Sequence, residues 1–303
     1  MHAPGYPARR AFIATEPRAA PTVSWWVLAL AAGVASALNV AASKRLVARV
    51  RPALLGGVVH LTGGILCLAL LPIVGADLAP ASARAPELAV MTGVYVIGNL
   101  LYFAALARTQ LSEIDLFLRS SALWTVVGGA ALLGESFPPA ALVGVVFVLA
   151  SLATVAERPR HLRFSGAQGL ALGAAVAFGA GNVVDKAISA PFDPLGYTAL
   201  NLVLTGVGML VVARPRAAEL RAPALWRPTA WTIAATFALT QWLLILAFTA
   251  GGSAGGVILL AQVRLLVLML VGVLLLGERD RLGRKAIAAV LMLAGVAALA
   301  AAG

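Results

Sequence analysis

The chain has 303 residues, of which 61% are apolar and 12% are charged, whereas about a quarter of the residues in soluble domains are charged. This composition excludes a soluble globular protein and predicts an integral membrane protein. The net charge of +11 does not indicate a nucleic-acid partner, because nearly all Lys and Arg residues lie in short segments between apolar runs, where they set membrane topology.

The N-terminal region contains Pro4, Pro7, Pro17 and Pro21, and residues 1–23 are predicted to form a disordered tail. No small-residue cleavage pattern follows the first apolar run, so we expect no signal peptide. The single cysteine, Cys67, provides neither a disulfide nor a cysteine-based metal site. The sequence therefore predicts no bound metal and no cofactor.

Ten apolar runs each approach the roughly 20 residues that a membrane-spanning helix needs. No connection between them is long enough to fold as a separate domain. The predicted fold class is therefore an all-α integral membrane protein with ten transmembrane helices. In chain order the runs cover residues 24–44, 53–75, 87–107, 111–133, 138–156, 166–188, 195–213, 228–249, 254–276 and 282–301.

The apolar runs repeat. Gly134-Glu135 ends the fourth run and Gly277-Glu278 ends the ninth, 143 residues later, and the same offset pairs Asn39 with Asn182. A repeat of this length specifies the architecture of the whole chain. We predict a first five-helix repeat over residues 24–156, a linker over 157–166 and a second repeat over 167–301.

Because each repeat crosses the membrane five times, the two halves have opposite orientations and form an inverted repeat. Inverted repeats of this kind surround a central cavity and support transport by alternating access. Orientation follows from charge. The connections on one side carry 16 Lys or Arg residues and those on the other side, with the termini, carry five. Because basic loops stay in the cytoplasm, this count predicts that both termini lie outside.

Arg119 and Arg264 lie well inside the fourth and ninth runs. A charge at the centre of a bilayer costs at least about 2.5–3.5 kcal/mol, so such residues usually face a cavity or a partner. Asp115 lies four residues before Arg119 and could pair with it on one helix, whereas Arg264 has apolar neighbours. The two arginines are predicted to line a substrate cavity; the alternative is a buried pair that fixes helix packing.

Other polar and aromatic residues inside the runs extend this candidate site. Tyr95, Asn99 and Tyr102 share one helical face, and a few polar groups among apolar walls are typical of a binding pocket. His60, Glu113 and Asp115 are candidates for proton coupling, while Asp185 and Lys186 are expected to reach the interface by snorkelling. The candidate substrate-binding residues are Arg119, Arg264, Asn39, Asn182, Tyr95, Asn99, Tyr102, Trp124, Gln241, Trp242 and Gln262.

The segments Leu132-Leu133-Gly134-Glu135 and Leu275-Leu276-Gly277-Glu278, with the passage from Tyr102 to Ser112, resemble EamA-type members of the drug/metabolite transporter superfamily. This resemblance implies a ten-helix basket around a central cavity, export of amino acids or other small metabolites, and cytoplasmic termini, in conflict with the charge count. The family often has proline midway along helices 4 and 9, where this chain has Ala122 and Leu265.

We therefore predict a secondary active transporter that exports small polar metabolites, such as amino acids or organic anions, across the plasma or inner membrane. It would act as a monomer or homodimer, with protons or a counter-substrate as coupling partner. The absence of an acidic residue in the first run argues against cation extrusion. The alternatives are a lipid-linked sugar flippase, an exchanger of nucleotide sugars or phosphorylated sugars, a scaffold subunit and a membrane-bound enzyme, although the sequence contains no reactive constellation.

Overall fold

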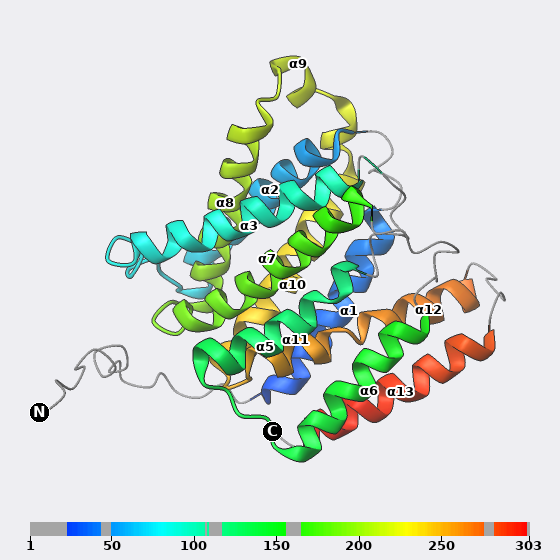
Figure 1. The fold of residues 1–303 in the computed structure, drawn as a ribbon. Helices are drawn as coiled ribbons and strands as arrows, with labels where there is room; N and C mark the ends of the chain where they lie inside the picture. The colour runs from blue at the N-terminus through cyan, green and yellow to red at the C-terminus, as the bar shows by residue number, and fades with distance from the viewer. Residues whose placement is uncertain are drawn as a thin grey trace, which may run out of the picture.

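The computed structural model describes residues 23–43, 50–106, 108, 117–155, 165–275 and 282–301. Residues 1–22 of the predicted N-terminal tail, Glu113, Asp115 and Gly277-Glu278 lie outside these ranges. Within them every regular element is helical (Figure 1). The α-helices are α1 (Trp25–Ser43), α2 (Pro52–Val74), α3 (Ala85–Leu106), α5 (Ser121–Leu133), α6 (Pro139–Val155), α7 (Gly166–Ile188), α8 (Pro194–Ala213), α9 (Ala217–Leu220), α10 (Pro228–Thr249), α11 (Ala254–Ala261), α12 (Arg264–Leu275) and α13 (Leu282–Ala301), with a 3₁₀ turn η1 (Pro223–Trp226).

Local chemistry sets several helix ends. The Ser165 hydroxyl accepts from the Gln168 amide while the Gln168 side chain accepts from the Ser165 amide, a capping box that begins α7. Asp193 caps α8 by accepting from the amides of Leu195 and Gly196. Gly134 ends α5 in the left-handed conformation with φ of 67°, which glycine adopts without a Cβ penalty.

Five of the described helices, α2, α3, α7, α8 and α10, are long and apolar enough to cross a membrane. Shorter apolar helices lie at Trp25–Val40, Phe117–Leu133, Pro139–Thr154, Ala254–Leu270 and Ala286–Ala301. These segments fall on the apolar runs predicted from the sequence, and α7 and α10 have the predicted bounds. The prediction of a helical, multi-pass membrane protein is confirmed.

The 143-residue offset relates the observed helices as well as the sequence. The bounds of α10, residues 228–249, become 85–106 when 143 is subtracted, and these are the bounds of α3. Residues 25–43 of α1 become 168–186, within α7. The packing follows the same relation, since α1 lies against α10 and α7 lies against α3. The first helix of each half, α1 or α7, therefore packs against a helix of the other half, α10 or α3.

Two other extensive contacts join helices that correspond to each other under the offset, α2 with α8 and α6 with α13. Helices α6 and α13 run side by side in Figure 1. Close approach explains the second pair. A Cβ added to Gly144 would lie 2.9 Å from the Gly295 carbonyl oxygen, and one added to Gly295 would lie 2.9 Å from the Gly144 oxygen. Small residues at such crossings allow backbones to pack directly in a membrane.

Candidate functional site

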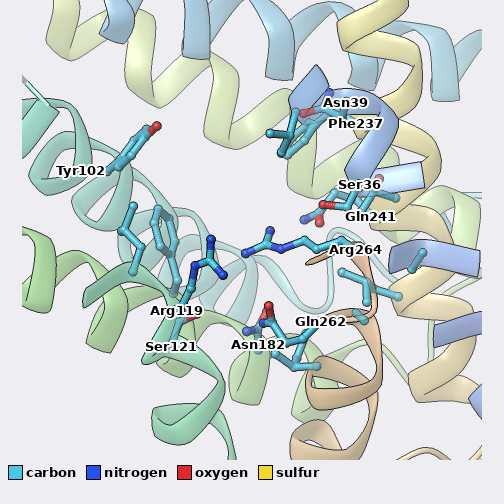
Figure 2. A pocket seen from close by; sticks show the side chains of 18 of the residues that line it. Ser36, Asn39, Tyr102, Arg119, Ser121, Asn182, Phe237, Gln241, Gln262 and Arg264 are labelled. Carbon is cyan, nitrogen blue, oxygen red and sulfur yellow. The ribbon is translucent and has the colours of Figure 1, made fainter. Parts of the chain in front are cut away.

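A cavity of about 680 Å³ lies between the helices and is lined from α1, α2, α3, α5, α7, α8, α10, α11 and α12 (Figure 2). Its volume falls within the range of small-molecule sites, which have mostly apolar walls and few polar groups. Apolar side chains such as Phe178, Leu244 and Ile258 form part of the wall. The polar lining consists of Ser36, Asn39, His60, Tyr95, Asn99, Tyr102, Arg119, Ser121, Asn182, Asn201, Thr240, Gln241, Gln262 and Arg264.

Arg119 and Arg264 enter this cavity from different helices, and their side chains extend toward each other in Figure 2. Arg119 lies in the helical turn that precedes α5, and Arg264 is the first residue of α12. Both side chains are partly buried. Two guanidinium groups in one cavity create a site of positive potential, because arginine remains charged under all ordinary conditions.

Both arginines adjoin an interruption in their helix. At the first, the Ser120 amide donates to the Phe117 carbonyl at 3.0 Å, and the Ser120 hydroxyl donates to the same oxygen at 2.6 Å. At the second, the Val263 amide donates to the Leu260 carbonyl at 3.0 Å. Such i→i−3 bonds tighten the helix locally. Residue 120 plus 143 is residue 263, so the interruptions are related by the repeat.

These interruptions occur without proline, since Ala122 and Leu265 occupy the positions where the resembled family often has it. At the first, the Ser120 hydroxyl competes for a main-chain carbonyl. At the second, Gln262 and Val263 lie between α11 and α12 as a turn. The helices are therefore interrupted at these two places although the proline that the resembled family often has there is absent.

Glycines hold neighbouring helices against both interruptions. A Cβ on Gly33 of α1 would lie 2.6 Å from the Ala261 carbonyl oxygen, next to the second interruption. One on Gly179 of α7 would lie 3.0 Å from the Ser121 carbonyl oxygen, at the first. The first helix of each half thus packs backbone to backbone against the interrupted helix of the other half.

The asparagines paired by the repeat line the same cavity but bond to different neighbours. Asn39 Nδ2 donates to the Ile233 carbonyl at 2.7 Å and to Thr236 Oγ1 at 3.2 Å, which ties α1 to α10. Asn182 Nδ2 donates to Thr125 Oγ1 at 3.1 Å, which ties α7 to α5. Each amide therefore joins the first helix of one half to a helix of the other half.

His60 and the polar face of α3 occupy further wall positions. His60 is buried, its Nδ1 lies 2.8 Å from the Gly56 carbonyl, and its ring centre lies 4.6 Å from that of Phe237. Because a carbonyl only accepts, Nδ1 carries the hydrogen. Asn99 Nδ2 donates to the Tyr95 carbonyl at 2.8 Å. The predicted face of Tyr95, Asn99 and Tyr102 does line the cavity.

Two predicted wall residues lie elsewhere. Trp242 is outside the cavity lining and packs beside a cluster that includes Cys67 and Leu202, because it follows Gln241 by one residue and a helix turns 100° per residue. Trp124 is outside the lining and 36% exposed. It lies five residues after Arg119, beyond the interruption and on another side of the helix.

The expectation that Asp185 snorkels to the interface is wrong. Its side chain is 2% exposed. Oδ2 accepts from the Tyr95 hydroxyl at 2.6 Å, and Oδ1 accepts from the Tyr197 hydroxyl at 2.7 Å and from Asn201 Nδ2 at 3.1 Å. Burying a carboxylate costs free energy unless hydrogen-bond donors contact its oxygens, as three donors do here. Tyr197 and Asn201 lie four residues apart in an apolar run, so their side chains share one helical face. This pattern is the sequence signal that could have predicted a buried polar partner for them.

A second cluster ties the helices together at one end. Glu135 accepts from the main-chain amides of Ala254, at 2.6 Å, and Gly255, at 3.4 Å, at the start of α11. Lys186 Nζ donates to the Phe248 carbonyl at 2.7 Å and interacts electrostatically with Glu135. These bonds join the C-terminal ends of α5, α7 and α10 to the N-terminus of α11.

The cavity extends away from this cluster. The N-terminal end of α1 is near the cluster, since a Cβ on Gly256 would lie 3.3 Å from the Trp25 ring. The cavity lining instead reaches Val40, near the opposite end of α1, and Leu106, the last residue of α3. The structure thus has one end tied by polar contacts and a cavity that reaches toward the other.

Membrane-length apolar helices around a polar cavity define a multi-pass membrane protein. Residues 23–156 match the model of the EamA-like transporter family. This match covers the first predicted repeat and confirms the resemblance to EamA-type transporters stated from the sequence motifs. A match to this family indicates a membrane transporter, since the family typically consists of transporters and not of enzymes.

A solved structure titled only "Crystal structure of protein" is similar over 90% of this chain and 94% of its own, with a TM-score of 0.69 and 19% sequence identity. At that identity the likeness establishes the fold alone. A search of curated proteins gave no significant match.

Proposed function

We propose that the protein is a secondary active transporter that binds an anionic group of a small polar metabolite between Arg119 and Arg264. The observation that carries this proposal is the convergence of the two side chains in one cavity (Figure 2). Like charges held together repel each other, and an anion between them removes that repulsion. Guanidinium groups bind carboxylates and phosphates through paired, charge-assisted hydrogen bonds.

The helix ends add to the positive potential. Ser121, the first residue of α5, and Arg264, the first residue of α12, both line the cavity. The N-terminus of an α-helix carries partial positive charge, and interrupted membrane helices in transporters direct such ends at anionic substrates. The amide side chains of Asn39, Asn182 and Gln262 would bond to the remaining polar groups of the metabolite.

The mechanism follows from the repeat. Two five-helix halves in opposite orientation would exchange roles, so that the end tied by Glu135 and Lys186 opens when the other end closes. The cavity now reaches toward the connections that carry most of the basic residues. By the positive-inside rule this side is cytoplasmic, where a substrate for export is loaded. The plasma or inner membrane is the proposed location.

A thermal-shift screen of the purified protein tests the substrate class. The ligands are a panel of amino acids, dicarboxylates, phosphorylated sugars, nucleotide sugars and organic cations. We expect stabilisation by anionic members, reaching about 2.7 kcal/mol at 100 times the dissociation constant. Arg119→Ala and Arg264→Ala should abolish the shift, and Arg51→Ala, which removes a charge paired with Glu219 outside the cavity, should retain it. Stabilisation by cations alone would refute the proposal.

A further inference from the structure

Asp185 is a buried carboxylate that the anion site does not use. Its three hydrogen-bond donors come from two other helices: Tyr95 from α3, and Tyr197 and Asn201 from α8. The side chains of Asp185 and Tyr197 are 2% and 0% exposed, and neither lines the cavity. Tyr95 and Asn201 bond to the carboxylate and also line the cavity. The carboxylate is therefore separated from the cavity by a single layer of side chains.

The charges around this carboxylate are few. Both oxygens accept hydrogen bonds, which is the pattern of the ionised form. The adjacent Lys186 donates to the Phe248 carbonyl at 2.7 Å. Other helices pack around Asp185. Helix α3 presents Tyr95 to the carboxylate and α8 presents Tyr197, whereas α5, α10 and α11 contain no ionisable side chain. Within the described residues, hydrogen bonds from neutral donors therefore stabilise the negative charge.

We propose that Asp185 is a proton-binding site reached from the cavity through the Tyr95 hydroxyl, and that its protonation strengthens anion binding by Arg119 and Arg264. A hydronium ion in the cavity gives a proton to Tyr95 Oη, and the hydrogen that Tyr95 held moves to Asp185 Oδ2. Water is left in the cavity, the tyrosine stays neutral and the carboxylate becomes a carboxylic acid. A tyrosine hydroxyl can do this because it both donates and accepts.

The coupling to anions is electrostatic and rests on the proposed function. Two guanidinium groups line the cavity and one carboxylate lies behind its wall. Neutralising the carboxylate removes negative charge that competes with a bound anion, so the two binding events favour each other. Linkage requires the effect to be reciprocal, and couplings of this kind typically change affinity about 5- to 150-fold. Anion binding should therefore draw a proton onto Asp185.

Protonation also changes how the helices are held. A carboxylic acid donates one hydrogen bond where the carboxylate only accepted. At least one of the three donors must then turn away or become an acceptor. In the relay the Tyr95 hydroxyl becomes this acceptor, so its bond to Asp185 reverses direction, and the bonds from Tyr197 and Asn201 lose the charge that strengthened them. The contact that joins α7 to α8 therefore weakens, which connects proton binding to helix packing.

Infrared difference spectra between neutral and acidic pH test the proton site without any anion. The chain has 12 Asp and Glu residues, so the readout is one component of the carbonyl-stretch band of protonated carboxyl groups. We expect this component in the wild type and in Asp193→Asn, whose carboxylate caps α8, and its loss in Asp185→Asn. Equal bands in Asp185→Asn and the wild type would overturn the proposal. If Asp185→Asn fails to fold, Tyr95→Phe decides: the band should appear more slowly after a pH jump, and an unchanged rate overturns the relay.

Calorimetry in buffers of different ionisation enthalpy tests the coupling, with glutarate and inorganic phosphate as probes. The wild type should take up protons as it binds a probe, and Asp185→Asn should bind the probe without proton uptake. Equal uptake in both proteins overturns the coupling. If the wild type binds neither probe, the anion site of the proposed function fails, whereas the infrared result still decides whether Asp185 binds the proton.

Discussion

Arg119 and Arg264 reach one cavity from helix interruptions that the 143-residue repeat relates, with Arg119 immediately before its interruption and Arg264 immediately after. The repeat aligns Arg119 with Gln262 and Arg264 with Ser121. Each interruption therefore contributes one cation and one neutral polar group. The two halves supply the same scaffold but carry the charge at positions that do not align in the repeat, which makes the binding site asymmetric.

Replacing either arginine with lysine tests whether the site uses the shape of the guanidinium group or its charge alone. Lysine keeps the positive charge but loses the planar pair of donors that matches a carboxylate. We expect Arg119→Lys and Arg264→Lys each to weaken binding of the anion found by the thermal-shift screen by about tenfold or more, which is about 1.4 kcal/mol. Titration of the purified variants measures this. Full affinity in both lysine variants would contradict bidentate recognition.

The packing of α1 on the second interruption predicts the effect of a single added carbon. Gly33→Ala would place a Cβ 2.6 Å from the Ala261 carbonyl oxygen, so the backbone must shift. Such overpacking costs about 1–3 kcal/mol, and the thermal midpoint should fall.

Gly93→Ala in α3 is the matched control, since a Cβ there meets nothing within 4 Å. Replacing a glycine inside a helix should stabilise it by about 0.5–1 kcal/mol. If both variants melt alike, the close approach of α1 to α11 is not a constraint on folding.

The Glu135 cluster predicts where local opening begins. Glu135→Ala removes the acceptor of the Ala254 and Gly255 amides, and the loss of such a cap costs about 0.5–2 kcal/mol. Amide hydrogen exchange at the start of α11 should accelerate. Glu219→Ala provides the control, because Glu219 accepts from the Arg216 amide and pairs with Arg51 in an exposed connection. Faster exchange at α11 in the control as well would show that the effect is not specific to this cap.

The helices were predictable because hydrophobicity and length dominate in a membrane. Residues 166–188 and 228–249 were predicted as helices and have those bounds. Much of the cavity lining was also predictable, since polar side chains inside apolar runs have few other places to lie. The position of Trp242 outside the cavity was not predictable. The sequence shows that polar and aromatic residues are adjacent in a helix, but not which of them faces the cavity once the helices pack.

Asp185 was misjudged for a related reason. Its distance from the predicted helix end suggested the interface, but burial depends on partners far away in the chain. Tyr95 is 90 residues earlier, and Asn201 belongs to the next helix, 16 residues later. Only the packing of α3 and α8 on α7 brings these donors together. Charge and depth are local properties of a sequence, whereas the pairing of a buried charge is a property of the assembled fold.

A double-mutant cycle of Arg119→Gln and Arg264→Gln, with binding of the anion found in the thermal-shift screen as the readout, tests the central claim most directly. If one anion contacts both guanidinium groups, the loss in the double variant should differ from the sum of the single losses by about 0.5–3 kcal/mol. Additive losses, or unchanged affinity in either single variant, would contradict a shared anion site.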